Sequence, residues 1–258
     1  MPTFLLLRER EARGLKLAAD EQRALYFGLH LLASLGISDA FLPLKSVLCG
    51  DILRTASLVG DAIGDTIPRV LMALADDRAD ICWDIVAAPQ TDWLIREAFL
   101  RCWTFLVLEG RIPMENAEDK LRHFPTTVAP EPDNFLWNAW MTAVADLGLS
   151  SLSPLVEQAF SSGLIENDAL ANLPSDIAAF HEGLDEATEA LRAEPHIQQR
   201  WKEHRGYVPF SGTSQDFIQA GQHVLSGQLE PVNLPLKAAD QNSSAFDNPA
   251  VDPKTTRD

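Results

Sequence analysis

Cysteine, tyrosine and long apolar stretches are scarce in this chain of 258 residues. The three cysteines, Cys49, Cys82 and Cys102, stand alone without Cys-x-x-Cys spacing, so we expect buried thiols and neither a disulfide framework nor a zinc site. No run approaches the ~20 apolar residues that a membrane helix needs, and the apolar residues from Phe4 to Leu7 are too few for a secretory signal. We therefore expect a cytoplasmic protein without a membrane segment, metal or cofactor.

Lysine and arginine are absent between Arg122 and Arg192, and this window holds 11 acidic residues of a chain whose net charge is −16. Such acidity disfavours nucleic acid as a partner, because phosphates would be repelled. We interpret residues 123–191 as a well-solvated helical surface, with a docking face for a basic partner as the alternative. The candidate partner-binding residues in it are Glu157, Glu166, Asp168, Glu182, Asp185 and Glu186.

Leucine and alanine are abundant and favour helices, and only two tyrosines are present, which argues against an all-β fold. Residues 41 positions apart match in the order cap, long helix, turn, proline and short helix. The pairs are Asp92 with Asp133, Ala98 with Ala139, Leu100 with Met141, Leu108 with Leu149, and Pro113 with Pro154. Helix pairs that repeat every ~40–47 residues are typical of HEAT and armadillo arrays. We predict an all-α, HEAT-like helical-repeat solenoid, an α-α superhelix, over residues 1–227, and an extended or disordered tail over 228–258.

The two long helices of this repeat carry many large aromatic side chains. We expect these side chains to pack between repeats, and the alternative is a groove that binds a peptide. They are Trp93, Phe99, Trp103, Phe105, Phe135, Trp137 and Trp140. Beyond the repeat, the pattern predicts helices over 168–180 and 184–193, followed by shorter helices over 197–205 and 214–224.

A candidate loop cluster lies in the segment Gly-Asp-Ala-Ile-Gly-Asp-Thr-Ile-Pro-Arg over 60–69, and consists of Asp61, Asp65 and Arg69. Paired carboxylates can perform acid–base chemistry or hold Mg²⁺. We favour a structural role, in which both aspartates cap the helix that follows. The chain lacks a phosphate-binding Gly-Lys-Ser/Thr loop, a Gly-x-Ser-x-Gly elbow and a His pair four residues apart, so the sequence assigns no catalytic residue.

This segment, with Leu31-Leu32-Ala33, Phe41-Leu42-Pro43-Leu44, 98–108, Glu109-Gly110-Arg111-Ile112 and the helix over 133–149, resembles the bacterial family called domain of unknown function 1186. The resemblance covers roughly residues 20–200. It implies a helical-repeat architecture and no established activity. Many relatives end in a Cys-rich zinc-binding tail related to one in a protein-export ATPase, whereas this chain has no cysteine after Cys102.

We therefore expect a non-enzymatic binding or scaffold protein. Its expected partner is a protein or peptide, basic or extended, because solenoids expose a long concave surface. The alternative is an enzyme of unknown class with a carboxylate site near Asp61 and Asp65.

Overall fold

The computed structural model describes residues 6–7, 9–10, 13–132, 134–165 and 176–225. These residues form twelve α-helices and three 3-10 helices, with no strand among them, so the all-α prediction is confirmed. The tail predicted over 228–258 lies outside the described residues. No helix in the described ranges is both long and apolar enough to cross a membrane.

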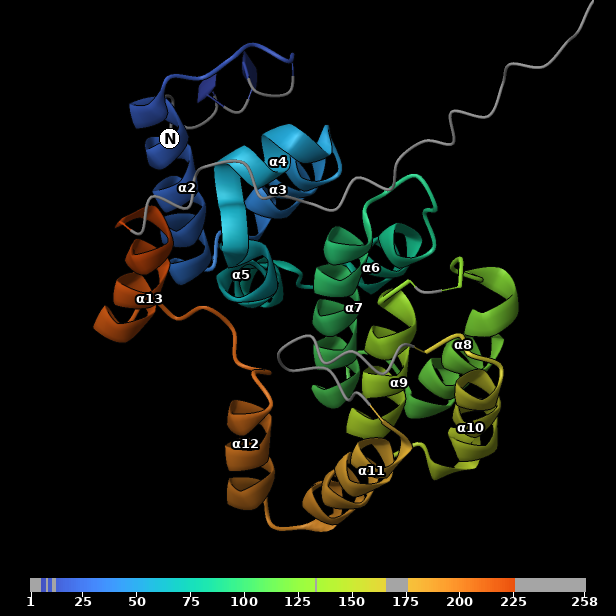
Figure 1. The fold of residues 1–258 in the computed structure, drawn as a ribbon. Coiled ribbons are helices and arrows are strands. Elements are labelled where there is room, and N and C mark those ends of the chain that lie inside the picture. Colours follow the sequence, from blue (N-terminus) through green and yellow to red (C-terminus); the bar gives the residue numbers. More distant parts are fainter. Residues whose placement is uncertain (1–5, 8, 11–12, 133, 166–175, 226–258) are drawn as a thin grey trace, which may run out of the picture.

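The helices follow one another in three groups along the chain (Figure 1). The first group is α2 (Ala19–Ser34), η1 (Ser38–Ala40), α3 (Phe41–Leu48), α4 (Ile52–Val59), η2 (Gly60–Gly64), α5 (Thr66–Leu74) and α6 (Ala79–Val86). The second group is α7 (Trp93–Leu108), α8 (Met114–Thr127), α9 (Leu136–Asp146), η3 (Ser150–Leu152) and α10 (Ser153–Ser161). The third group is α11 (Ile177–Arg192), α12 (Pro195–His204) and α13 (Ser214–Leu225).

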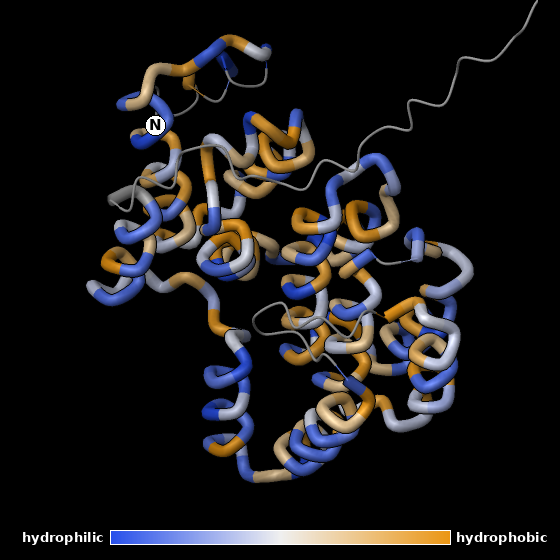
Figure 2. Tube along the Cα trace, viewed as in Figure 1, coloured by the Kyte–Doolittle hydropathy of each residue, from blue (hydrophilic) through white to orange (hydrophobic). Residues whose placement is uncertain are grey.

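Helix α7 is the centre of the core. It packs against α5, α6 and α9, and its sequence is apolar on almost every side, which is the pattern of a buried helix. Its Phe99 ring meets Phe41 of α3, and its Trp103 ring lies 4.7 Å from the Trp83 ring of α6. Figure 2 shows this concentration of apolar residues in the interior helices and the polar surface of α12.

Helix α9 forms the next layer, packed between α7 and α11, and all its residues are buried. Its Trp137 and Trp140 rings lie 5.7 and 5.6 Å from Phe124 of α8. Half-buried Trp93 and Phe135 lie 5.2 Å apart at the start of the two long helices. The aromatic residues therefore pack the core as expected, although Trp93 also has a second role, described below.

The prediction of two helices over 168–180 and 184–193 is wrong for the part that the structure describes, because α11 is continuous from Ile177 to Arg192. The Asp176 carboxylate caps the helix by accepting from the Ala179 amide at 2.7 Å. Buried Phe180 and Leu184 then share one face that packs on the core. Gly183 does not break α11, and it faces Ala145 of α9 without crowding.

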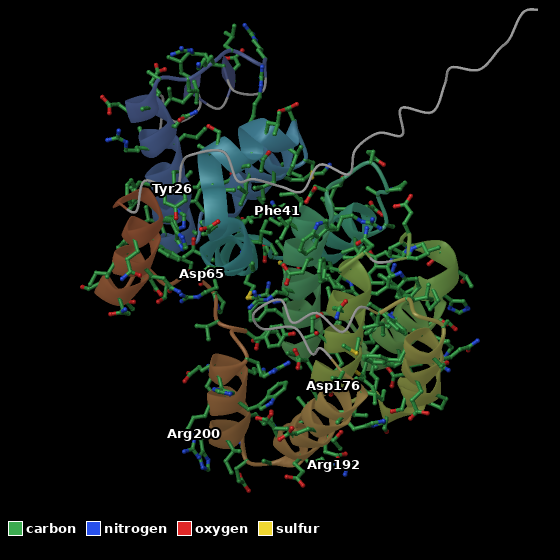
Figure 3. All side chains as sticks on the ribbon, in the orientation of Figure 1. Tyr26, Phe41, Asp65, Asp176, Arg192 and Arg200 are labelled. Atoms are coloured by element: carbon green, nitrogen blue, oxygen red, sulfur yellow. The ribbon has the colours of Figure 1, made fainter. Side chains whose placement is uncertain are left out.

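A segment that we call the strap, residues 205–213, returns the chain from α12 to the first group of helices (Figure 1). It turns at Gly206, whose φ of +79° suits glycine. Its Tyr207 and Phe210 side chains are buried, and the Phe210 amide donates to the Arg69 carbonyl at 2.9 Å. Helix α13 then packs against α2 and η2. In Figure 3, Asp65 lies near α13, whereas Arg192 and Arg200 lie at the far end of the molecule.

Candidate functional site

A cleft of about 910 Å³ opens between α7, α9, the strap and the turn that joins η2 to α5. Clefts of this size commonly hold small molecules or peptide segments. Helix α7 supplies one wall with Trp93, Leu94, Glu97, Leu100, Arg101 and Thr104, and α9 supplies another with Ala139, Thr142, Ala143 and Asp146. The remaining wall residues are Gly60, Asp61, Ile63, Gly64, Asp65, Arg69, Glu203, His204, Arg205, Gly206, Tyr207, Val208 and Gln219.

Glu97 is the most unusual wall residue. Its side chain is only 9% exposed, and burial raises the pKa of its carboxyl while the charge of Arg101 opposes that rise. Its nearest cation is Arg101, whose Nε lies 3.8 Å from Oε1, beyond hydrogen-bond length. No donor among the described residues bonds the Glu97 carboxyl, which lines the cleft.

Two neighbours of Glu97 on α7 extend the same polar row. The Arg101 guanidinium donates through Nη1 to the Gly64 carbonyl at 3.2 Å, which directs it toward η2. The Thr104 hydroxyl is fully buried and has no hydrogen-bond partner within the described chain. A buried polar group of this kind costs free energy until it is paired. The α7 wall therefore offers the Glu97 carboxyl as an acceptor and the Arg101 guanidinium as a donor to the cleft, while the Thr104 hydroxyl is closed off from solvent.

On α9, the Asp146 carboxylate anchors the strap. It accepts from the Tyr207 hydroxyl at 2.6 Å and from Arg205 Nε at 2.9 Å. Burial raises the pKa of Asp146. Burial also lowers the pKa of Arg205, but the charge and hydrogen bond of Asp146 together with the charges of Tyr207 and Glu186 outweigh this effect and raise it. Two guanidinium nitrogens face the carboxylate, so this pair is ionised and already satisfied.

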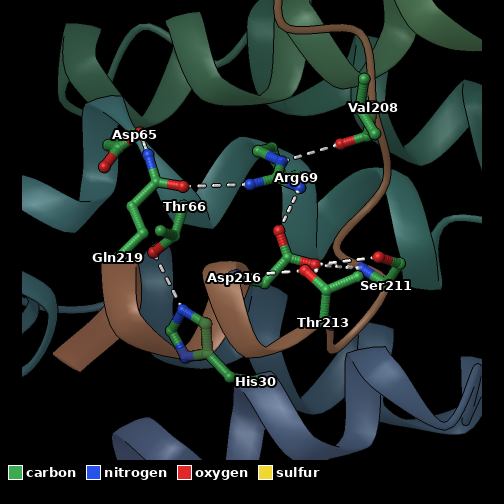
Figure 4. A network of polar contacts seen from close by, with 9 residues as sticks. All are labelled: His30, Asp65, Thr66, Arg69, Val208, Ser211, Thr213, Asp216 and Gln219. Atoms are coloured by element: carbon green, nitrogen blue, oxygen red, sulfur yellow. Dashed lines mark hydrogen bonds and ion pairs between the residues drawn. The ribbon is translucent and has the colours of Figure 1, made fainter. Parts of the chain in front are cut away.

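A second network joins α5 to α13 (Figure 4). Arg69 donates to Asp216 at 2.6 Å, to the Val208 carbonyl and to Gln219. Burial alone would raise the pKa of Asp216, but hydrogen bonds from Arg69 and Ser211 outweigh it and lower the pKa to about 2. Asp216 also accepts from the Thr213 amide, while the Thr213 hydroxyl accepts from the Asp216 amide. This reciprocal pair is a capping box that begins α13.

The three residues of the candidate loop cluster all line the cleft. The prediction that Asp65 caps α5 is wrong: it stands at the N-cap position but bonds no amide of that helix. Its oxygens instead accept from Gln219 Nε2 at 2.8 Å and His223 Nε2 at 2.9 Å, because α13 packs close by. Asp61 is exposed in the first turn of η2, and no backbone amide in the described ranges donates to it.

The acidic residues singled out from the sequence lie elsewhere, on the outer helices. Glu182, Asp185 and Glu186 are exposed on one face of α11. Exposed Glu157 of α10 lies 3.3 Å from His181 Nε2 of α11. Glu166 and Asp168 lie outside the described residues.

Metal-binding geometry is not found: within the described ranges, no three His, Cys, Asp or Glu side chains are placed to hold an ion. The expected burial of the thiols is confirmed for Cys82 and Cys102, whose sulfurs lie 3.9 Å apart, and Cys49 is partly buried.

Sequence reasoning did not find the α7 row or the strap contacts. Glu97 and Arg101, four residues apart on a helix, have the spacing of an ordinary surface ion pair, and nothing local shows that they are buried. The strap contacts of Asp146 come from residues 59 and 61 positions later. One signal was available: Arg96, Glu97 and Arg101 interrupt a mostly apolar helix.

The described residues form an all-helical fold with a partly enclosed cleft that is lined by both charged and apolar side chains. Residues 17–202 match the family described as "Protein of unknown function (DUF1186)". The match covers well over half of the sequence, so the chain belongs to this family. Comparison with curated proteins and with solved structures finds no match. The α7 and α9 walls of the cleft lie inside the matched residues, whereas the strap and α13 lie beyond them.

Proposed function

We propose that this protein is a non-enzymatic binding protein whose cleft holds a segment of a partner polypeptide. The observation that carries the proposal is the α7 row, where buried Glu97 lacks a hydrogen-bond donor and buried Thr104 lacks a partner within the described chain. With Arg101, this row combines an acceptor and donors. A peptide backbone presents the complementary N–H and C=O groups along its length.

The other charged groups of the cleft support binding over catalysis. Arg69 is bonded to Asp216, and Asp146 is bonded to Arg205 and Tyr207. Groups that satisfy one another hold the walls in place and are not poised to transfer a proton.

We also propose that the cleft lies on the inner face of a HEAT-like array in which α7–α8 and α9–α10 are successive repeats. Three features support this. Ala98 and Ala139, 41 residues apart, are both buried. Pro113 directly precedes α8 and Pro154 stands in the first turn of α10. Finally, α7, α9 and α11 pack in sequence. In such arrays the inner helices line the binding surface, and here α7 and α9 form the walls of the cleft.

The acidic face of α11, formed by Glu182, Asp185 and Glu186, is proposed to steer a basic partner toward the molecule. A cytoplasmic setting is part of the proposal, because reducing conditions keep the three free cysteines as thiols.

The alternative function is an enzyme of unknown class. One observation favours it: Asp61 and Asp65 line the same cleft as Glu97, whose pKa is raised. It is the weaker proposal because Gln219 and His223 occupy the Asp65 oxygens.

The binding proposal is tested by selecting peptides from a phage-displayed library of random dodecapeptides on the full chain and measuring resynthesised peptides by fluorescence anisotropy. A Gly64→Trp variant fills the cleft, because the space beside Gly64 is open and its backbone is not left-handed. Gly221→Trp on α13 is the matched control, since Gly221 has the same open surroundings and does not line the cleft. We expect Gly64→Trp to weaken binding at least about tenfold and Gly221→Trp to preserve it.

Circular dichroism and thermal melting confirm that both variants fold. The proposal is wrong if no peptide is enriched, or if the enriched peptides bind Gly64→Trp as tightly as the unaltered protein.

A further inference from the structure

We propose that the cleft recognises its partner through a basic side chain, arginine or lysine, whose cationic end is held by the Glu97 carboxylate. This inference rests on the proposed polypeptide-binding function and adds the chemistry of the bound group.

Glu97 is a buried carboxylate that lacks a hydrogen-bond donor among the described residues, and a ligand cation would supply one. Its side chain is only 9% exposed, yet no described residue donates a hydrogen bond to it. Arg101 is too far for a hydrogen bond and is held by the Gly64 carbonyl. A buried carboxylate is stable when a cation with well-placed N–H groups completes it. A guanidinium or ammonium group that enters the cleft would supply those N–H groups.

The walls of the cleft carry excess negative charge, which favours a cationic ligand. Five carboxylates and three arginines line the cleft, a net charge of −2 with His204 neutral. Two of the arginines are neutralised by direct pairing, Arg69 with Asp216 and Arg205 with Asp146. Arg101 therefore supplies the one arginine charge that would repel a ligand cation, whereas a ligand anion would meet the full excess of negative charge.

An apolar wall beside Glu97 suits the methylene stem of a basic side chain. Trp93 precedes Glu97 by four residues on α7, so the two side chains share a face. Leu94, Leu100, Ala139 and Ala143 continue this wall. Arginine and lysine carry long methylene stems that pack on apolar surface while the charged end finds its partner, and a tryptophan ring also attracts a nearby cation.

The test uses n-butylguanidinium chloride, which reproduces the end of an arginine side chain, in an NMR titration of the full chain. Sodium butyrate and n-butanol are the anionic and neutral probes of similar shape. We expect saturable shifts of the Glu97, Arg101 and Thr104 amide signals with n-butylguanidinium alone, with a Kd on the order of 1–10 mM. Equal shifts with butyrate or butanol would overturn the inference.

Two matched variants test whether Glu97 is the residue that binds the cation. Glu97→Gln keeps the shape and removes the negative charge, and we expect it to abolish the saturable shifts. Glu182→Gln makes the same change at an exposed position of α11 and should leave the shifts intact. Undiminished binding of n-butylguanidinium by a folded Glu97→Gln protein would refute the role of Glu97.

The peptides selected above separate this inference from the function on which it rests. A supporting result is enrichment of one arginine or lysine whose replacement by alanine weakens binding at least about tenfold. If peptides without a basic residue bind in the cleft and n-butylguanidinium does not, the inference fails and the proposed function stands. If n-butylguanidinium binds at Glu97 and no peptide does, the proposed function fails and charge recognition stands.

Discussion

The Asp216 carboxylate holds helix α13 on the body of the protein, and its replacement by asparagine should loosen that helix. Asp216 is 7% exposed at its side chain and accepts hydrogen bonds from Arg69, from both the amide and the hydroxyl of Ser211, and from the Thr213 amide. Asp216→Asn keeps the size of the side chain, removes its charge and leaves the 16%-exposed Arg69 side chain without its carboxylate.

The magnitude follows from the pKa of Asp216, which is about 2 in the folded protein against 3.8 ordinarily. A shift of one unit corresponds to about 1.4 kcal/mol, so the folded state gains about 2 kcal/mol from ionised Asp216. The side chain is shielded by its direct neighbours but lies close to the protein surface, so this value is an upper bound. Because the pKa is lowered on folding, the gain is complete above pH 3.8 and is lost as pH falls toward 2.

The assay is amide hydrogen exchange followed by mass spectrometry on peptides from the strap and α13, because that helix can open without global unfolding. A loss of about 2 kcal/mol corresponds to exchange about 30-fold faster at pH 7. Asp185→Asn, at an exposed position of α11, is the control and should change nothing. A change below about threefold in Asp216→Asn would refute the reasoning, since the network would then contribute no stability to α13.

Three further predictions concern buried polar groups. Burial lowers the pKa of His30 from 6.5 to about 4. The free energy of unfolding should therefore fall by about 3 kcal/mol as pH drops from 6.5 to 4, because the unfolded state binds the proton first. Urea denaturation of His30→Gln should lack this dependence of stability on pH. Glu97→Gln should raise the Tm at neutral pH by a few degrees, because burial penalises the ionised carboxyl and raises its pKa; a lower Tm in calorimetry would contradict this. Tyr207→Phe removes the hydroxyl that donates to Asp146 at 2.6 Å and should lower the free energy of unfolding, measured in urea, by about 1–2 kcal/mol. Tyr26→Phe, which removes a hydroxyl that donates to the Ala220 carbonyl, is the comparison.

Local patterns in the sequence identified elements whose causes are themselves local. Asp92 was expected to cap the first long helix, and its carboxylate accepts from the Leu94 amide at 2.9 Å. Asp133, its counterpart in the second repeat, lies outside the described residues, and α9 begins after Phe135, with Asn134 accepting from the Leu136 amide. Spacing of apolar residues sufficed for the helices because each buries a continuous stripe.

The site could not be predicted in the same way, because its chemistry depends on contacts between distant residues. Asp65 stands where a helix cap belongs, and sequence alone favours that role. Its donors, Gln219 and His223, follow 154 and 158 residues later. Glu97 was overlooked for the opposite reason: its spacing to Arg101 is that of a solvated pair, and only the packing of α5, α6 and α9 around α7 makes it buried.

The extent of the family match divides the cleft into two parts with different physical roles. Glu97, Arg101 and Thr104 lie inside the matched residues, on the α7 wall that we propose meets the ligand. Arg205, Tyr207 and Asp216 lie beyond the match, and each is bonded to a residue within it, Asp146 or Arg69. The strap and α13 are therefore held at the cleft by charge pairs, whereas the groups proposed for recognition lie on the α7 wall. Under the proposed binding function, substitutions at Glu97 should change the contacts with the ligand, and substitutions at Asp216 should change how firmly α13 is held.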